Sequence, residues 1–356
     1  MTLYSRVRPF AFQLPAETAH DLGKRTLRAA QSTWPTRAAL SAAYQYEHPA
    51  LEVDLFDTTF PNPVGVAAGF DKNAEVTHAL RALGFGFAEI GTVTPHPQSG
   101  NDRPRLFRLR DDEGMINRMG FNGQGMTQVR DRLEADGTPS FPLGVNIGKM
   151  NVSTEREAIE DYRRVFTRLS PFADYVVVNV SCPNTPDEFD ETSPEHLRTI
   201  FETLEDEAHT DVPMLVKIGP DEPADAVLEL VDIVQELGLD GIVATNTSTS
   251  RDGLESPNRE EWGGLSGKPV EDRSTDVIRS ITEHTDGDLP IIGVGGVDSP
   301  VSAYRKIRAG ASLVQLYTGF VYQGPSTAKR INRGLVALLK RDGFDSVEDA
   351  VGADLE

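Results

Sequence analysis

Side chains able to bind or react gather at the ends of the short apolar runs of this sequence, where amides, hydroxyls and lysines outnumber histidines and carboxylates. Asparagine both donates and accepts hydrogen bonds, so several of them suit a flat ligand with alternating C=O and N–H groups. Lys217 could hold positive charge against an electron-rich ring, although a lysine at a strand end can also reach solvent. The positions are 68–72, 92, 146, 179–184, 217, 245–247, 293–296 and 317–319.

The chemistry that these residues favour involves a phosphate and a planar ring rather than a metal or a nucleophile. Glycines at Gly293–Gly296 would let backbone N–H groups approach a phosphate, but tight turns before helices need glycine as well, so both explanations stay open. The seven histidines lack metal-ligand spacing, so we expect no metal site. No local Ser-His-Asp or Cys-His pattern is present. A phosphate, a polarisable ring and an amide-bearing ligand together suggest FMN and a pyrimidine.

Short β-branched runs alternate along the chain with longer amphipathic stretches, a pattern that predicts strands followed by helices. These strands and helices would position the residues named above. Eight such runs favour an α/β protein with a closed (β/α)8 TIM barrel, whose active site lies at the carboxyl ends of the strands. The expected strands are 63–67, 87–92, 143–147, 175–180, 214–218, 241–245, 291–294 and 313–316. Expected helices include 73–83, 154–169, 194–208 and 223–237.

We divide the chain into an N-terminal helical extension (1–50), the barrel (51–341) and an acidic tail (342–356) that should fray. The extension mixes aromatic residues such as Phe10 and Trp34 with Arg6, Arg8 and Lys24, which suits a helix pair on a membrane surface. It could instead be a helical cap that closes the bottom of the barrel. No apolar run approaches the ~20 residues that span a bilayer.

The charge balance excludes nucleic acid as a partner, because Asp and Glu number 55 against 35 for Lys and Arg, a net charge of −20. The chain is either an ordinary acidic protein or one adapted to high salt, which screens such repulsion. A single cysteine excludes an intrachain disulfide and favours a reducing cytoplasm. Only eight lysines remain, so Lys72, Lys149 and Lys217, which lie in or beside apolar runs, are of interest.

From about Tyr4 to Leu339 the sequence resembles the dihydroorotate dehydrogenases, and in particular their class 2, quinone-reducing branch. The basic and aromatic N-terminal extension and the run Asn-Arg-Met-Gly-Phe are typical of class 2 rather than class 1. The motifs are Ala68–Lys72, Glu89–Pro95, Arg103–Arg108, Asn117–Asn122, Asn179–Pro186 and Gly263–Pro269.

This resemblance implies two sets of binding residues. The FMN set is Ala68, Gly69, Lys72, Thr92, Asn146, Asn179, Lys217, Thr245, Gly267, Gly296, Tyr317 and Thr318. The dihydroorotate set is Lys72, Asn117, Arg118, Met119, Gly120, Phe121, Asn179, Asn184, Asn246 and Thr247.

Cys182 occupies the position of the catalytic base, where class 2 enzymes normally have serine and class 1 enzymes cysteine. It could instead be a small buried residue that fills core space. Ser181 is the second candidate base. The resemblance implies that Cys182 removes a proton from C5 of (S)-dihydroorotate while hydride passes from C6 to the flavin, which yields orotate for pyrimidine (UMP) biosynthesis.

The implied electron acceptor is a membrane quinone, which would place the chain peripherally on the cytoplasmic side of the cell membrane, with no obligate protein partner. Because Cys182 is a class 1 feature, a soluble acceptor such as fumarate or NAD is an alternative. A flavoprotein that senses pyrimidines without turnover is a more remote one.

Overall fold

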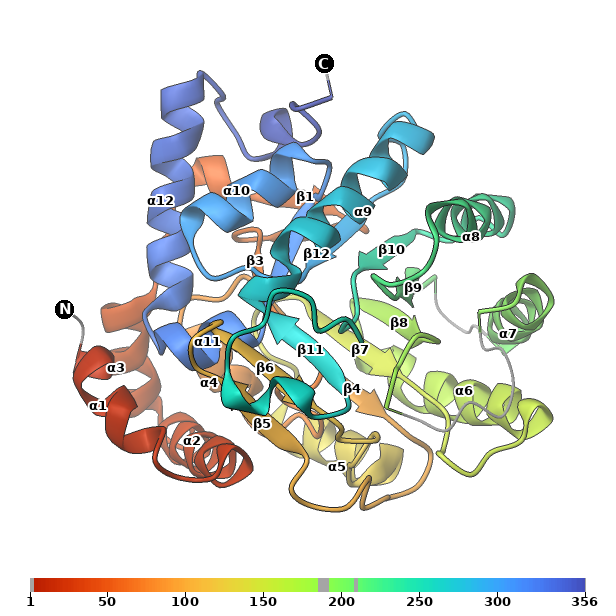
Figure 1. Cartoon of the computed structure of the whole chain (residues 1–356), viewed down its shortest axis with the longest axis horizontal. Coiled ribbons are helices and arrows are strands. Elements are labelled where there is room, and N and C mark those ends of the chain that lie inside the picture. The colour runs from red at the N-terminus through yellow and green to blue at the C-terminus, as the bar shows by residue number, and fades with distance from the viewer. Residues whose placement is uncertain (1–2, 185–191, 208–210, 356) are drawn as a thin grey trace.

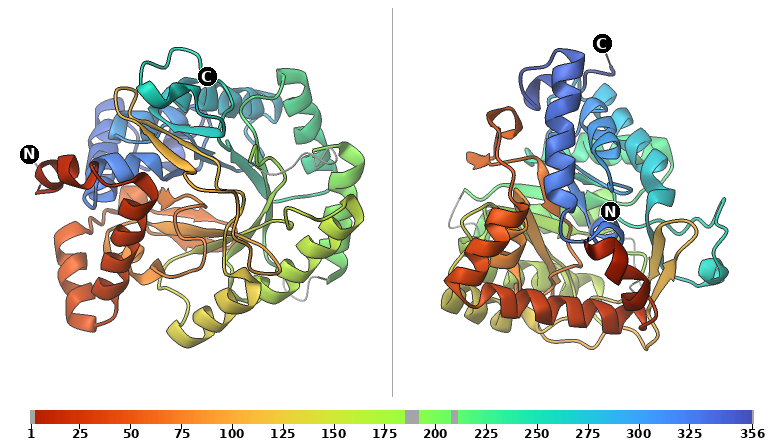
Figure 2. Two further views of the ribbon diagram at one scale, coloured as in Figure 1. Left: turned by 60° about the horizontal axis from the view of Figure 1, so that its bottom comes forward. Right: turned by 90° about the vertical axis from the view of Figure 1, so that its left-hand side faces the viewer.

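The computed structural model describes residues 3–184, 192–207 and 211–355, in which eight parallel strands close into a barrel surrounded by helices (Figures 1 and 2). The predicted (β/α)8 barrel is therefore confirmed. No predicted strand end is off by more than one residue. In the order in which they pair, the strands are β10 (Gly241–Ala244), β12 (Ile291–Val294), β13 (Leu313–Leu316), β3 (Val64–Val66), β4 (Phe87–Val93), β7 (Leu143–Ile147), β8 (Tyr175–Asn179) and β9 (Met214–Ile218).

The helices around the barrel include one at each of the four predicted amphipathic stretches, 73–83, 154–169, 194–208 and 223–237. They are α4 (Thr77–Ala82), α5 (Gly125–Asp136), α6 (Glu155–Leu169), α7 (Pro194–Glu207), α8 (Ala224–Glu236), α9 (Glu271–His284), α10 (Pro300–Arg308), α11 (Thr318–Gln323) and α12 (Thr327–Asp342). In α6 the Glu157 carboxylate accepts a hydrogen bond from the backbone N–H of Thr154, which caps the first turn. Ala208, the last residue of one expected helix, lies outside the described residues.

One predicted helix is shorter than expected. The stretch 73–83 forms a helix only from Thr77, because the Asp71 carboxylate accepts the backbone N–H groups of Glu75 and Val76 and holds the preceding residues in a turn. Side-chain acceptors of this kind compete with helical hydrogen bonds. The turn brings Lys72 to the mouth of the barrel.

A hairpin of two short strands closes the amino-terminal end of the barrel. The Phe60 ring lies 5.3 Å from the ring of Phe87, the first residue of β4, and Phe56 lies 6.0 Å from Tyr175, the first residue of β8. Gly144 makes room for this layer, since a Cβ there would lie 2.2 Å from the Tyr175 ring. The hairpin strands are β1 (Val53–Leu55) and β2 (Thr58–Phe60).

The N-terminal extension forms three helices, rather than a pair, and they do not close the bottom of the barrel. They pack against α4, α11 and β5 near the carboxyl ends of the strands (Figure 1). Glu17 accepts a hydrogen bond from Arg105 at 2.8 Å, and Lys24 lies 3.3 Å from Asp71. The idea of a bottom cap is therefore wrong. The helices are α1 (Leu3–Ala11), α2 (Ala16–Gln31) and α3 (Trp34–Tyr44), and no helix in the described ranges is long and apolar enough to cross a bilayer.

A three-stranded antiparallel sheet lies over the mouth of the barrel and was missed by the sequence analysis (Figure 1). Two segments inserted between barrel elements form this sheet, one after β4 and one after β10. Asn117 is the register partner of both Leu106 and Gly264, so the two segments meet at this asparagine. The strands are β5 (Leu106–Leu109), β6 (Gly114–Asn117) and β11 (Gly264–Gly267).

The acidic tail does not fray, so that prediction was wrong. Val347 and Ala350 are completely buried against the barrel, and the backbone N–H of Val347 donates to the carbonyl of Ala50 at 2.9 Å. The Asp354 N–H donates to the carbonyl of Arg308. Two apolar side chains within an acidic stretch are enough to anchor it.

Candidate active site

A pocket of about 1090 Å³, including its open mouth, lies where the carboxyl ends of the barrel strands meet the β11-β6-β5 sheet. This is the expected place for the active site of a TIM barrel. Lys72, Lys217, Cys182 and five asparagine and glutamine side chains from six segments line it, and no Asp, Glu or His is among its described lining residues. In a chain of net charge −20, this pocket is a local site for anions.

The structure brings nearly all predicted site residues to this pocket. The lining includes Cys182, eleven residues of the FMN set and nine of the dihydroorotate set. Asn146 lies one layer deeper, where it bonds Thr92 and Glu89. The Arg118 guanidinium instead binds Glu261 at 2.7 Å, over the Phe107 ring. Thr185 and Pro186, the end of one motif, lie outside the described residues.

Several lining residues were not predicted. Ser266 and Gly295 belong to runs that the sequence analysis had singled out, and Gln315 is a polar residue inside an otherwise apolar strand. A polar side chain in a strand buried on both faces is a signal that could have identified Gln315. The others are Leu106, Val294 and Gly319, which also lie in such runs, and Ala67, Met115, Val270, Val297 and Leu316.

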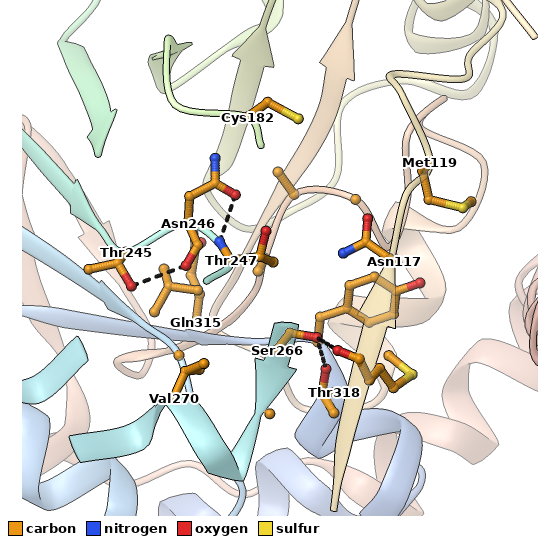
Figure 3. Close-up of a pocket in the computed structure, with 18 of the residues that line it drawn as sticks. Asn117, Met119, Cys182, Thr245, Asn246, Thr247, Ser266, Val270, Gln315 and Thr318 are labelled. Atoms are coloured by element: carbon orange, nitrogen blue, oxygen red, sulfur yellow. Dashed lines mark hydrogen bonds between the residues drawn. The ribbon is translucent and has the colours of Figure 1, made fainter. Parts of the chain in front are cut away.

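A chain of hydrogen bonds orients the amides at the base of the pocket. Thr92 donates to Asn146 Oδ1 at 2.5 Å, and Asn179 Nδ2 donates to Thr92 Oγ1 at 2.9 Å. Asn246 Nδ2 in turn donates to Asn179 Oδ1 at 3.1 Å, and its own Oδ1 accepts the backbone N–H of Thr247 (Figure 3). The direction of each donor is therefore set before a ligand binds, which favours binding of one orientation.

A second group of amides lies where the loop after β8 meets the β11-β6-β5 sheet. Asn184 Nδ2 donates to Asn117 Oδ1 at 3.2 Å, while Asn184 Oδ1 accepts the backbone N–H of Gly264 at 3.2 Å. Beside them Ser266 and Thr318 share a hydrogen bond of 2.8 Å that links β11 to the start of α11 (Figure 3). The pocket is thus lined by amides on its base and on its cover.

Lys217 carries a buried ammonium at the base of the pocket. It is 5 % exposed, and its Nζ lies 3.7 Å from Glu89 Oε1, beyond hydrogen-bond distance. Within the described part of the chain, no protein acceptor takes a hydrogen bond from this ammonium. A buried cation with unused donors is costly unless a ligand accepts them.

Lys72 is the second cation, at the mouth of the pocket. Its ammonium donates to Asn122 Oδ1, and no carboxylate of the described residues is paired with it. Burial, followed by the positive charge of Arg105, lowers the pKa of Lys72 to about 7, and Cys182 acts in the opposite sense. A carboxylate that bound there would hold Lys72 in its charged form.

Cys182, rather than Ser181, faces the pocket (Figure 3). The Ser181 hydroxyl donates to the carbonyl of Lys217 at 2.7 Å and accepts from Asn246 Nδ2 at 3.1 Å. Ser181 is therefore engaged in holding the loop, and Cys182 lies near enough to Lys72 for the two to interact electrostatically. A neighbouring ammonium favours a thiolate over a thiol.

Helix α2 forms part of the wall behind the pocket. The His20 ring lies 5.3 Å from the Phe70 ring and 5.9 Å from that of Tyr317, which lines the pocket. Burial, then the charges of Lys24 and Lys72, lowers the pKa of His20 to about 4, so this histidine is neutral near pH 7. An apolar and aromatic wall thus separates the pocket from the N-terminal helices.

Comparison with known proteins assigns the family. The sequence model of the dihydroorotate dehydrogenases matches residues 50–339. The chain belongs to the dihydroorotate dehydrogenase family. It is 52 % identical to "Dihydroorotate dehydrogenase (quinone)" of Halobacterium salinarum strain R1, over 99 % of this chain and 100 % of the relative, and to that of Natronomonas pharaonis over 100 % of both. A crystal structure of DHODH from Eimeria tenella with ferulenol superposes with a TM-score of 0.86 at 36 % identity, covering 96 % of each chain.

Membership of this family implies a bound flavin, and the pocket fits one. The Lys217 ammonium, buried and with unused donors, suits the electron-rich edge of an isoalloxazine ring. Gly295 and Gly296 place backbone beside the pocket, but a Cβ on Gly296 would lie 2.3 Å from Glu271 Cβ. Packing alone therefore explains Gly296. In the described residues no group of His, Cys, Asp and Glu side chains is arranged to hold a metal ion.

The low pKa of Lys72 predicts a pH-dependent gain in stability when the lysine is replaced. Its folded-state pKa of about 7 lies below the ordinary 10.5, so the folded chain binds fewer protons between these values and gains stability as pH rises through them. Below pH 7 the whole penalty of burying the charge is present. In the ligand-free chain, Lys72→Met should therefore be more stable than the parent at pH 6, by about 1–2 kcal/mol after allowance for water in the pocket.

Thermal or urea unfolding at several pH values measures this difference, which should shrink as the pH rises from 7 towards 10. Lys340→Met, on the exposed face of α12, is the matched control and should show no such trend. An advantage of Lys72→Met that stays the same at pH 6 and pH 10 would contradict this account of Lys72.

Proposed function

We propose that the chain oxidises (S)-dihydroorotate to orotate in pyrimidine biosynthesis, with FMN as its cofactor and a quinone as the electron acceptor. The observation that carries this proposal is the pocket itself. It combines the buried Lys217 and the half-buried Lys72 with two layers of oriented amides, and its described lining holds no carboxylate. A planar anion bearing amide groups is the ligand that such a lining complements.

The pocket-lining residues of the FMN set hold the cofactor, and those of the dihydroorotate set hold the substrate. When bound, FMN supplies the acceptor for the two electrons that leave the substrate. Lys72 pairs with the substrate carboxylate, and the amides of Asn117, Asn184 and Asn246 bind the ring carbonyl and N–H groups. Fixing the ring in one orientation is the main contribution of these side chains to the rate.

Cys182 takes the proton from C5 of the substrate. Its place in the pocket and the neighbouring Lys72 charge support this role, because the ammonium favours the thiolate that accepts the proton. Oxidation removes one proton from C5 and a hydride from C6, so one base and one two-electron acceptor complete the reaction. Because Cys182 is also the class 1 residue, a soluble acceptor such as fumarate or NAD is the second candidate for reoxidation.

A quinone is favoured as the acceptor by the N-terminal helices. Relatives that match this chain over their full length are named as quinone enzymes. Through His20, α2 packs on Phe70 and Tyr317 at the wall of the pocket, so an apolar acceptor held by the helices would approach the cofactor from that side. An apolar route of this kind is of no use to fumarate or NAD.

The N-terminal helices also supply the features of a peripheral membrane contact on the cytoplasmic side. Five of the eight large exposed apolar side chains in the described residues lie between positions 7 and 34, and Phe10 and Trp34 are each more than 70 % exposed. Basic residues accompany them. Relatives from Halobacterium and Haloarcula support the high-salt interpretation of the net charge, and in high salt this apolar surface matters more than the charges.

Anaerobic spectroscopy tests the proposed function directly. The purified protein should be yellow with one FMN per chain, dihydroorotate should bleach the flavin absorbance without air, and a quinone should restore it. Fumarate or NAD in place of the quinone tests the second candidate. A flavin that binds orotate but is never bleached would show a binding protein rather than an enzyme, and a bound FAD would exclude the cofactor assignment.

The assignment of the base predicts a loss of rate without a loss of binding. Cys182→Ala should slow anaerobic bleaching by about 10²–10⁴-fold, which is typical of a positioned base, while orotate affinity changes little. Cys182→Ser should keep partial activity with its pH dependence moved upward, because a hydroxyl releases its proton less readily than a thiol.

The matched control for the base is Ser181→Ala. Its hydroxyl faces the backbone of Lys217 instead of the pocket, so most of the rate should remain. If Cys182→Ala is bleached as fast as the parent while Ser181→Ala is slow, the base has been assigned to the wrong residue.

The membrane contact predicts a selective loss with lipid-embedded quinone. The double variant Phe10→Ser/Trp34→Ser should bind vesicles at least several-fold more weakly and reoxidise slowly with a long-chain quinone in the vesicles, because apolar area drives insertion. Bleaching by dihydroorotate and reoxidation by a short, water-soluble quinone should be unchanged. Val152→Ser/Val301→Ser, exposed elsewhere, is the control. Equal vesicle binding by both double variants would rule out this membrane surface.

A further inference from the structure

Glu89 is a buried carboxylate inside the barrel that the proposed mechanism does not use. It is 1 % exposed and lies on β4, below the pocket. Asn146 Nδ2 donates to its Oε1 at 2.8 Å, and Gln315 Nε2 donates to its Oε2 at 2.8 Å. Both oxygens thus accept from amide N–H donors, as suits a carboxylate, which in its ionised form is an acceptor only.

The nearest cation to this carboxylate is Lys217. The two charges are 3.7 Å apart without a hydrogen bond, and both side chains are almost completely buried. Glu89 lies below the lining of the pocket, whereas Lys217 is part of it. The pair therefore has one charge turned to the ligand and the opposite charge directly behind it.

A buried pair of this geometry affects any group that changes its charge in the pocket. Electrostatic interactions are strong in the protein interior, and a charge placed behind a cation reduces the attraction of that cation for electrons added in front of it. Lys217 favours the reduced and more negative form of a flavin. Glu89 opposes this effect through its own charge.

We propose that Glu89 lowers the reduction potential of the bound flavin by partly neutralising Lys217, as a positioning residue beneath the cofactor. This inference rests on the proposed function, because it requires a flavin against Lys217. The consequence is a cofactor that is reduced less readily by the substrate and reoxidised more readily by the acceptor. Glu89 would thereby balance the two half-reactions without touching either reactant.

The test replaces the charge but keeps the shape, in Glu89→Gln. The new amide can keep its oxygen towards Asn146 and turn its NH₂ towards Gln315, whose Oε1 has no hydrogen-bond partner in the described structure and can accept after rotation of the amide. The midpoint potential of the flavin in the holoprotein is then measured against a reference dye. The equilibrium constant for two-electron reduction should rise by about tenfold or more, a positive shift of about 30 mV or more.

Tyr175→Phe is the matched control, since it removes only an uncharged partner of Gln315 from the same buried network. Its flavin potential should stay close to that of the parent, because no charge changes. A structural disturbance of the network would move the potential of both variants. An electrostatic role moves that of Glu89→Gln alone.

A pair of variants at Lys217 keeps the test decisive if Glu89→Gln does not fold with flavin. Lys217→Gln should lower the potential, and Glu89→Gln/Lys217→Gln, in which both charges are gone, should lie above Lys217→Gln. A potential that is unchanged or lower on removal of the Glu89 charge, in either background, overturns the proposal. If dihydroorotate still bleaches the flavin in those samples, the proposed function stands even when the Glu89 proposal is overturned. If the parent chain binds no flavin, the proposed function itself is contradicted.

Discussion

The cost of holding the Lys217 ammonium inside the barrel is the constraint on which the site depends. A buried cation is tolerated only with a compensating charge or with acceptors for its donors. Here the compensation is partial, since Glu89 lies 3.7 Å away and makes no hydrogen bond to it. The rest comes from acceptors inside the pocket, which water or a ligand can supply. Lys72 presents the same situation at the mouth of the pocket, where burial lowers its pKa to about 7. The pocket is therefore selective for ligands that bring negative charge to two places.

The remainder of the architecture keeps these charges in place. Barrel closure brings β4 and β9 to face each other across the interior, which is how Glu89 and Lys217 meet. The β11-β6-β5 sheet places Asn117 opposite Asn184, and α2 adds the aromatic wall around Tyr317. The apolar layer at the opposite end, built on Tyr175 and Phe87, makes the barrel a packed scaffold whose only polar end is the mouth.

The parts of the structure that could be predicted from the sequence are those with a local signal. β-branched runs located every barrel strand, and family motifs located most of the polar side chains that line the pocket. The antiparallel sheet was missed because its strands are four residues long and one of them, β11, is about 150 residues from its neighbour β6 along the chain. The tail was misjudged because its composition is acidic, although two apolar residues anchor it.

The roles of Glu89 and Asn146 could not be predicted from the sequence. β4 and β7 are buried on both faces, so alternation does not indicate which side chains point into the barrel and which lie behind the pocket wall. Asn146 was assigned to the cofactor, but its side chain bonds Thr92 and Glu89 one layer below the pocket lining, and Glu89 was noted only as part of a motif. Arg118 was assigned to the substrate because the motif around it lines the pocket, but its own side chain pairs with Glu261. Contacts between distant elements decide these roles.

A crystal structure of the chain with FMN and orotate is the most direct test of the claim that Lys72 and Lys217 define the ligands of this pocket. The account predicts that Lys217 Nζ donates to the flavin ring while Glu89 remains behind it, and that Lys72 Nζ lies within hydrogen-bond distance of the orotate carboxylate. A flavin bound elsewhere, or an orotate whose carboxylate lies away from Lys72, would contradict it.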